Sequence, residues 1–470
     1  MMIELPNSSV TFQTSHTLVQ KLFDEAESKC RINRKDFLGR TVLLEGGGYE
    51  KIFLETQPMG GEMYAKRDLR VGLNNQLLFM EYQRADGRMP GSIMRRDGRL
   101  IPEFNKLSGF CFPAPALNLY YLTGRDPDYL NLLGSVLERF DAYLWRTHDT
   151  DGDGCLESWC TFDTGEDHAV RYEDAPEPWS EEHPPAGCRI VPMASMDVMS
   201  FSFSARDILS RICRIRGDEK AEELWRRKAE EVRAKIRTYL WDEAKGACFD
   251  RDKEHRPLPA MLHNNLRLMY WGSISPDMAH RFVTEHLLNP QEFWTPMPLP
   301  SVAVNDPQFR NIPTNNWSGQ PQALTYQRAI RALENYGYDD LIPYLGWKLM
   351  EAIGERCVFV QQYDPFTAQP SAVALEGEQD AYGPAMLAVL EYISRIYGVH
   401  REGETLYWGT YGHGESLYAQ EWGDDTFRLV QDDSHAEAYI NERQIFSAPK
   451  NCKILTDLKG NILRISSGSL

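Results

Sequence analysis

The sequence predicts a mainly α-helical chain, in which antiparallel helical hairpins close into a toroid and a small β domain follows. Three helix–glycine–aspartate–helix units between residues 60 and 398 predict the hairpins, and β-rich segments after Gly403 predict the β domain. Long loops at 149–195 and 286–317 interrupt the hairpins. A solenoid does not need such loops, whereas a closed ring can use them to build a central cleft.

The composition narrows the class of partner. The 470 residues carry a net charge of −17 without a basic run, which argues against nucleic-acid and anionic-membrane binding. No apolar run has the length of a membrane helix, and Met1–Val10 lacks the pattern of a signal peptide. Nine scattered cysteines without a CxxC pair indicate reduced thiols and a cytoplasmic location. We expect no cofactor and no metal, and the sequence leaves the oligomeric state open.

Residues 1–60 are expected to form a mixed segment that packs on the toroid. Phe12–Cys30 has the spacing of an amphipathic helix, and Thr41–Leu44 and Ile52–Leu54 are typical of short strands. The glycines of Gly46–Gly48 lie between these strands. They are not followed by Lys-Ser/Thr, so they predict a turn and not a phosphate loop.

Residues 61–400 are expected to form the toroid. The segments Leu117–Leu133, Ile212–Trp225 and Ala332–Leu345 share one device: a glycine ends one helix and an aspartate caps the next. The pairs are Gly124 with Asp126, Gly217 with Asp218, and Gly337 with Asp339.

Residues 401–470 are expected to form a small β-rich domain, because apolar and polar residues alternate between polar turns. The expected strands are Thr426–Val430, Ala438–Ile440, Gln444–Phe446, Lys453–Leu455 and Ile462–Ile465.

The segment Trp159–Asp174 concentrates the chemistry. Carboxylates crowded among aromatic rings can have their pKa values pushed apart, as general acid and base catalysis requires, and aromatic faces suit sugar rings. The alternative is an acidic, solvated loop. The residues concerned are Asp163, Glu166, Asp167, Glu173 and Asp174 with Trp159, Phe162 and Tyr172.

Six motifs in their order along the chain resemble those of the six-hairpin (α/α)6 glycosidases, above all the trehalase and processing α-glucosidase group (glycoside hydrolase families 37 and 63). Each motif is weak alone, and the shared order carries the resemblance. The motifs are Pro58–Asp68, Thr164–Arg171, Val191–Ser200, Trp294–Pro307, Asn315–Pro321 and Leu324–Gly337.

The resemblance implies an inverting glycosidase that acts on a small α-glucoside or related α-glycoside. Asp167 falls on the general acid, and Asp68 falls on a sugar-binding aspartate whose usual Trp neighbour is Arg67 here. A surface salt bridge is the alternative role of Asp68. Further residues expected at the substrate are Arg67, Arg171, Trp294, Asn315, Asn316, Trp317, Gln361 and Tyr363.

The chain departs from the family at the base, because Gln361 stands where the family has a Glu two residues before a Tyr. A Gln side chain cannot accept a proton from water. Glu378 or Glu376 can supply the base from the same loop, with Glu378 preferred. Alternatively, phosphate replaces water and the chain is a phosphorylase, or the chain binds sugar without turning it over.

The stretch Asp149–Gly154 resembles the start of a calcium loop. The twelfth position is Cys160 instead of the expected Glu. A polar turn is therefore the preferred interpretation, and calcium binding is the alternative.

Overall fold

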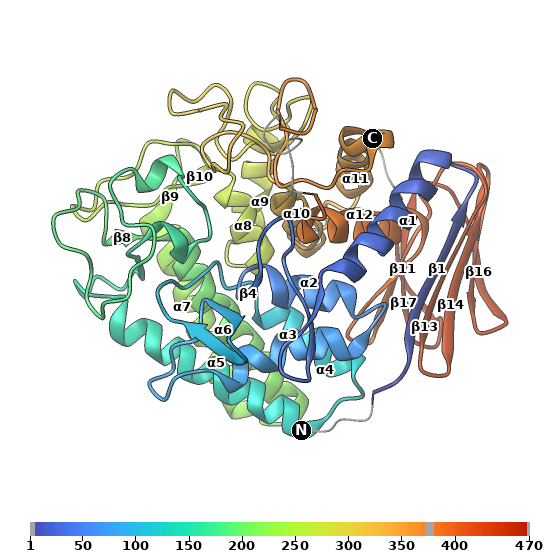
Figure 1. The fold of residues 1–470 in the computed structure, drawn as a ribbon, viewed down its shortest axis with the longest axis horizontal. Coiled ribbons are helices and arrows are strands. Elements are labelled where there is room, and N and C mark those ends of the chain that lie inside the picture. The colour runs from blue at the N-terminus through green and yellow to red at the C-terminus, as the bar shows by residue number, and fades with distance from the viewer. Residues whose placement is uncertain (1–4, 372–379, 468–470) are drawn as a thin grey trace.

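The computed structural model describes residues 5–371 and 380–467 and has the toroid expected from the sequence. Six inner helices each pack on the next, and the last packs on the first, which closes the ring (Figure 1). They are α2 (Thr56–Tyr64), α4 (Pro113–Leu122), α6 (Met196–Arg216), α8 (Asn264–Trp271), α10 (Ala323–Tyr336) and α12 (Gly383–Tyr397).

Six outer helices surround the ring. Every residue of α8 is buried, whereas the outer helix α7 buries only Ala229 and Val232, as expected for a helix with one face in water. The outer helices are α1 (Thr17–Ile32), α3 (Leu69–Glu81), α5 (Pro127–Thr147), α7 (Glu219–Lys235), α9 (Pro276–Phe282) and α11 (Leu341–Ile353). Single π turns extend α7 over Ile236–Leu240 and α9 over Val283–Leu287.

Two of the three expected aspartate caps are present. Asp126 accepts hydrogen bonds from the first backbone N–H groups of α5, and Asp218 does the same for α7. Asp339 does not cap α11. Its carboxylate lies 2.5 Å from Lys453 Nζ of the β domain, and Asp340 begins the helix without a side-chain cap. The third aspartate therefore joins the ring to the β domain.

The β domain has two antiparallel sheets, and its first strand comes from the other end of the chain. Strand β1 (Ser8–Thr14) pairs with β13, so Phe12 lies in a strand and the helix expected from Phe12 begins at Thr17 instead. One sheet has the order β1, β13 (Ser416–Trp422), β14 (Asp425–Gln431), β15 (His435–Ile440), β16 (Arg443–Pro449). The other has the order β11 (Val399–Glu402), β12 (Thr405–Gly409), β17 (Cys452–Asp457), β18 (Ile462–Ser467).

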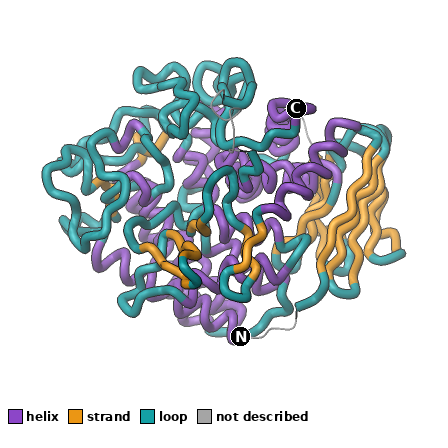
Figure 2. The backbone as a smooth tube through the Cα atoms, in the orientation of Figure 1, coloured by secondary structure: helices purple, strands orange, loops and turns teal. Residues whose placement is uncertain are grey.

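Short antiparallel sheets lie among the loops of the ring, which cover the left and the top of the view in Figure 2. The domain boundaries at residues 60 and 400 stay a prediction. Among the helices of the described residues, none combines the length and the apolarity that crossing a bilayer requires. The short sheets are β2 (Arg34–Asp36) with β3 (Thr41–Leu43); β4 (Lys51–Phe53) with β5 (Ser92–Arg96) and β6 (Arg99–Glu103); β7 (Glu157–Ser158) with β8 (Met193–Ala194); and β9 (Trp241–Asp242) with β10 (Ala247–Cys248).

Candidate active site

The candidate site lies where inner helices begin. Glu55, His263, Gln322 and Tyr382 are the residues that precede α2, α8, α10 and α12. The starts of α8 and α10 meet directly, because His263 Nδ1 lies 3.1 Å from Thr325 Oγ1. Helix N-termini carry partial positive charge, so this end of the ring favours carboxylates and developing negative charge.

Asp167 stands on a loop between two 3₁₀ turns, Thr161–Asp163 and Val170–Tyr172. Its backbone carbonyl accepts a hydrogen bond from Trp317 N at 3.0 Å, and its Oδ2 accepts one from Asn315 Nδ2 at 2.6 Å. Burial raises the pKa of Asp167, and the bond from Asn315 offsets only part of that effect. A carboxyl that keeps its proton to higher pH suits a general acid.

Asn315 belongs to a small polar ring beside Asp167. Its Oδ1 accepts from Gln361 Nε2 at 2.7 Å, and Gln361 Oε1 accepts from the hydroxyl of Tyr49 at 3.1 Å. The same hydroxyl accepts from Asn315 Nδ2 at 3.1 Å. The structure therefore brings the expected acid, Asn315 and Gln361 together, with the Gln side chain held on both of its polar atoms.

Glu55 is a buried carboxyl below the loop of Asp167. Gly165 and Gly109 both have positive φ, and a Cβ at either residue would collide with the Glu55 carboxylate. Arg328 pairs with Glu55, and Arg267 Nη2 lies 3.5 Å from its Oε1. Burial nevertheless raises the pKa of Glu55 to about 7 against both guanidinium groups.

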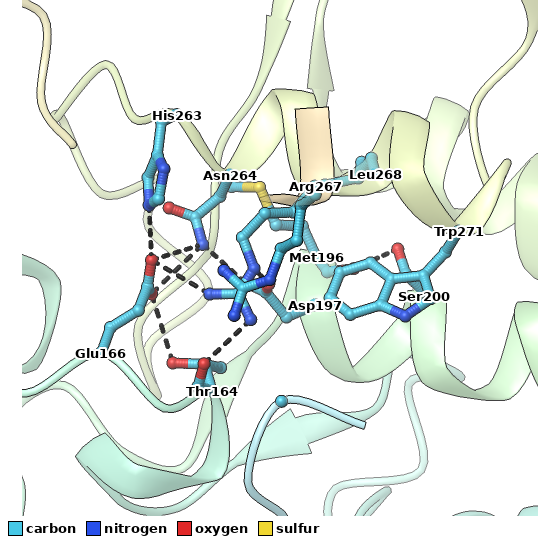
Figure 3. A network of polar contacts seen from close by, with 12 residues as sticks. Thr164, Glu166, Met196, Asp197, Ser200, His263, Asn264, Arg267, Leu268 and Trp271 are labelled. Atoms are coloured by element: carbon cyan, nitrogen blue, oxygen red, sulfur yellow. Dashed lines mark hydrogen bonds and ion pairs between the residues drawn. The ribbon is translucent and has the colours of Figure 1, made fainter. Parts of the chain in front are cut away.

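Glu166, the neighbour of Asp167, anchors the loop (Figure 3). Its carboxylate lies 2.7 Å from His263 Nε2, 3.1 Å from Asn264 Nδ2 and 3.1 Å from Arg267 Nη1. Burial would raise its pKa, but Arg171 and Arg267 outweigh burial and hold the pKa of Glu166 well below its usual range. The pKa values of the two consecutive carboxyls are thus shifted in opposite directions, downward for Glu166 and upward for Asp167.

Arg171 is part of this anchor and does not contact Asp167 in the described contacts. Its guanidinium pairs with Glu166, with Asp197 Oδ2 at 2.8 Å and with Asp250 Oδ2 at 2.5 Å, and its side chain is fully buried. The structure therefore gives it the role of fixing the loop, in place of the expected direct sugar contact.

Arg67 and Asp68 do not join the site, which corrects the sequence prediction. Arg67 Nε pairs with Glu27 at 2.5 Å. Asp68 caps α3 through two backbone N–H groups, and Arg34 Nη2 lies 3.1 Å from its Oδ2. The alternative role considered for Asp68, a salt bridge, is the one the structure shows.

The remaining expected residues divide into two groups. Trp317 lies beside the site, since its backbone binds Asp167 and its ring is 5.6 Å from that of His263. Asn316 is adjacent, but its Oδ1 caps the local turn at Ser318 N. Trp294 stacks on Tyr344 of the outer helix α11 with ring centroids 4.8 Å apart, and its expected sugar contact stays a prediction. Tyr363 is enclosed in the core.

The two expected bases, Glu376 and Glu378, lie outside the described residues. Sequence reasoning missed three site residues: Glu45, Tyr49 and Glu55. Glu45 Oε1 accepts a hydrogen bond from the Tyr382 hydroxyl at 3.0 Å. The signal that could have found both glutamates is their position two residues after a short strand, where the chain enters a glycine turn at Glu45 and a helix at Glu55.

A separate cavity of about 610 Å³ lies toward the C-terminal ends of α8 and α10 and includes Trp271, Arg331 and Tyr336. It does not contain Asp167. A carboxyl with a shifted pKa, Glu334, also lines this cavity, so pKa values alone do not locate the site. We place the site at the N-terminal ends of the inner helices because Asp167, Asn315 and Gln361 meet there.

Two groups of side chains in the described residues have the composition of metal ligands, each with ligand atoms within 4.8 Å of one another. One contains Asp151 and Asp153 of the expected polar turn with His255. An imidazole is not among the oxygen ligands that calcium takes, so this group does not favour the calcium alternative. The other contains two glutamates that Arg331 already neutralises. The members of the second group are Glu62, His400 and Glu402.

Comparison with known proteins points to one family. The family model of the mannosylglycerate hydrolase MGH1-like glycoside hydrolase domain matches residues 53–382. The fold is similar to a GH63 mannosylglycerate hydrolase from Thermus thermophilus, with a TM-score of 0.63 and 17% identity over 79% of this chain and 100% of that one. It is also similar to the neutral trehalase of Saccharomyces cerevisiae, with a TM-score of 0.56 and 12% identity over 78% of this chain and 79% of that one.

A sialidase has a TM-score of 0.71 and 13% identity over 96% of this chain. This chain spans only 41% of the sialidase's length. At these identities the structural matches show the fold.

Proposed function

We propose that this chain, which belongs to the mannosylglycerate hydrolase MGH1-like glycoside hydrolase family, hydrolyses a small α-glycoside with inversion at the anomeric carbon. Membership makes the chain a glycosidase. The observation that carries the finer proposal is Asp167: a largely buried carboxyl with a raised pKa, held at the start of the inner helices by Asn315. Its partner Asn315 binds Gln361, which stands at the position expected for the base.

In the proposed reaction, Asp167 donates its proton to the glycosidic oxygen as the bond from that oxygen to the anomeric carbon breaks. A water molecule attacks the anomeric carbon from the opposite face and gives a proton to a carboxylate. The products are a free sugar of inverted configuration and an alcohol. Glu55 packs under the Asp167 loop at Gly165, and Glu166 with Arg171 holds that loop in place.

The site and the relatives support the proposed substrate class. The site residues are polar and closely hydrogen-bonded, which suits the hydroxyls of one sugar ring. The names of two similar structures refer to mannosylglycerate and trehalose hydrolysis, both reactions of small α-glycosides. We therefore propose a small α-glucoside or α-mannoside. The cysteines of the described chain are all free, which supports the proposal of a reducing, cytoplasmic setting.

The test is turnover of a defined panel with the anomer of the product observed. Trehalose, mannosylglycerate and the 4-nitrophenyl α-glucoside and α-mannoside are incubated with and without inorganic phosphate, and the first product is followed by proton NMR. Release of the β-anomer in the absence of phosphate supports inverting hydrolysis. Initial release of the α-anomer, or no release from any member, contradicts it.

A phosphorylase is the second candidate, and Gln361 is the observation that favours it. A phosphate nucleophile carries its own negative charge and needs no protein base. Turnover that depends on phosphate and yields a sugar 1-phosphate would identify this reaction. Binding of the panel sugars without turnover under either condition would identify a carbohydrate-binding protein.

A further inference from the structure

Water attack needs an ionised group to receive a proton, and the Gln361 amide cannot serve. Three buried glutamates lie around Asp167 in the described residues: Glu45, Glu55 and Glu166. Glu166 is ruled out because His263, Asn264 and two arginines occupy its oxygens.

Glu55 is excluded by its packing. Its carboxylate fills the space left by Gly165, two residues before Asp167 on the same loop. The acid and the base of an inverting enzyme must approach the anomeric carbon from opposite faces. A carboxyl packed under the acid's own loop and paired with Arg328 cannot do so.

Glu45 lies on the side of Gln361. It ends the segment that leads from β3 into the glycine turn, and Tyr49 at the end of that turn donates its hydroxyl to Gln361. The turn is held by Tyr382: a Cβ at Gly47 would touch its ring, and its hydroxyl binds Glu45 Oε1 at 3.0 Å. A backbone hydrogen bond also holds the start of this turn, since Gly383 N donates to Glu45 O at 2.6 Å.

We propose that Glu45 is the group that accepts the proton of the attacking water, in place of the glutamate that Gln361 replaces. This inference depends on the proposed hydrolysis. The water oxygen forms a bond to the anomeric carbon and its proton passes to Glu45, while the glycosidic oxygen leaves with the proton of Asp167. Glu45 then loses its proton to solvent and Asp167 regains one, so the enzyme returns to its starting state.

The charges that face Glu45 are consistent with this role. Burial raises the pKa of Glu45 to about 8, and the negative charges of Glu55 and Asp167 add to the effect against hydrogen bonds from Tyr382 and Thr56. Because the charge of Asp167 itself raises the pKa of Glu45, protonation of Asp167 favours ionisation of Glu45. The coupling therefore favours a single proton on the pair, and the productive form is the one in which Asp167 holds that proton and Glu45 does not.

The experiment compares the full-length wild type with Glu45→Gln, Glu45→Ala and Glu50→Gln, using the 4-nitrophenyl glycoside that the wild type cleaves. Glu50 is exposed near the end of the same turn and serves as the matched control. We expect Glu45→Gln to lower kcat by about 10² to 10⁴-fold, because general base catalysis contributes that range. Because the productive form carries one proton on the Asp167 and Glu45 pair, the wild-type profile of kcat/KM against pH should have two limbs. One limb should disappear in Glu45→Gln, and both should persist in Glu50→Gln.

Sodium azide separates catalysis from folding. In Glu45→Ala the azide ion can attack the anomeric carbon without a base, so we expect recovery of turnover and a glycosyl azide of inverted configuration. A wild type that hydrolyses the panel, with Glu45→Gln within threefold of it, would overturn the inference and leave the proposed function standing. Lost activity without azide recovery and without a changed pH profile would also overturn it, as a structural defect. A wild type without hydrolysis would overturn both.

Discussion

Asn315 bridges Asp167 and Gln361 through the two ends of one amide: its Nδ2 lies 2.6 Å from Asp167 Oδ2, and its Oδ1 lies 2.7 Å from Gln361 Nε2. A carboxylate at position 361 could not donate to Asn315 Oδ1. The amide at position 361 is therefore matched to the orientation in which Asn315 donates to the acid. The hydrogen bonds of the site therefore fit Gln361, the residue that departs from the family pattern.

Replacing Asp167 with Asn removes the proton donor and keeps the shape of the side chain. The introduced amide can still meet Asn315 by turning its oxygen toward Nδ2, so sugar binding should persist. We expect kcat to fall by at least about 10²-fold on a substrate with a poor leaving group. The fall in kcat should be smaller on activated substrates such as 4-nitrophenyl glycosides, because their leaving groups need less protonation. Equal losses on both substrate types would contradict the role of Asp167 as the acid.

Replacing Asn315 with Ala should shift the pH dependence of the acid. The bond from Asn315 stabilises the ionised form of Asp167 and lowers its pKa against the effect of burial. Its loss should raise that pKa further, so the alkaline limb of kcat should move to higher pH. The measurement is kcat against pH for Asn315→Ala and wild type. A limb that moves to lower pH, or stays, would show that the limb does not report Asp167.

The sequence predicted the fold well because helix ends and periodic apolar faces are local signals. Gly217 and Asp218, for example, end one helix and cap the next as expected. The family match and the similar folds confirm the six-hairpin resemblance. What local signals could not give was the pairing of β1 with β13, since the two strands lie about four hundred residues apart.

The site was predicted only in part. Asp167, Asn315 and Gln361 were expected near one another because each lies in a loop that resembles a motif of the family, and the structure brings them together. Asp68 was misplaced because a carboxylate before a helix has the same sequence whether it binds sugar or caps α3. Glu45 and Glu55 were missed because each is a single glutamate in an apolar stretch, and only the closed ring brings them near Asp167.

Replacing Arg171 with Met should destabilise the fold strongly. Its fully buried guanidinium pairs with Glu166, Asp197 and Asp250. Arg267 would still contact Glu166 and Asp197, whereas Asp250 would lose its cation among the described contacts. Loss of one partner of a buried ion pair typically costs about 3–5 kcal/mol. The free energy of unfolding in urea should fall by that order. Arg189→Ala, which breaks an exposed pair, is the control and should change it much less. Similar small effects in both variants would contradict the anchoring role.

Replacing Gln361 with Glu restores the family residue and adds a second acceptor for the proton of water. Tyr49 can still donate to the new carboxylate, but Asn315 Oδ1 loses its donor, so the polar ring must rearrange. The new group lacks the deep burial of Glu45 and should be ionised at lower pH. We therefore expect hydrolysis at pH 6 to rise by about tenfold or more, with an optimum at lower pH than the wild type.

The decisive comparison is the double variant Glu45→Gln/Gln361→Glu, assayed without phosphate beside Glu45→Gln and Gln361→Asn. Recovery of hydrolysis in the double variant would show that a carboxylate at either position can receive the proton. Gln361→Asn keeps an amide and should gain nothing. If Gln361→Glu behaves like Gln361→Asn, position 361 does not face the attacking water. The predicted bases Glu376 and Glu378 would then be tested next by separate replacement with Gln.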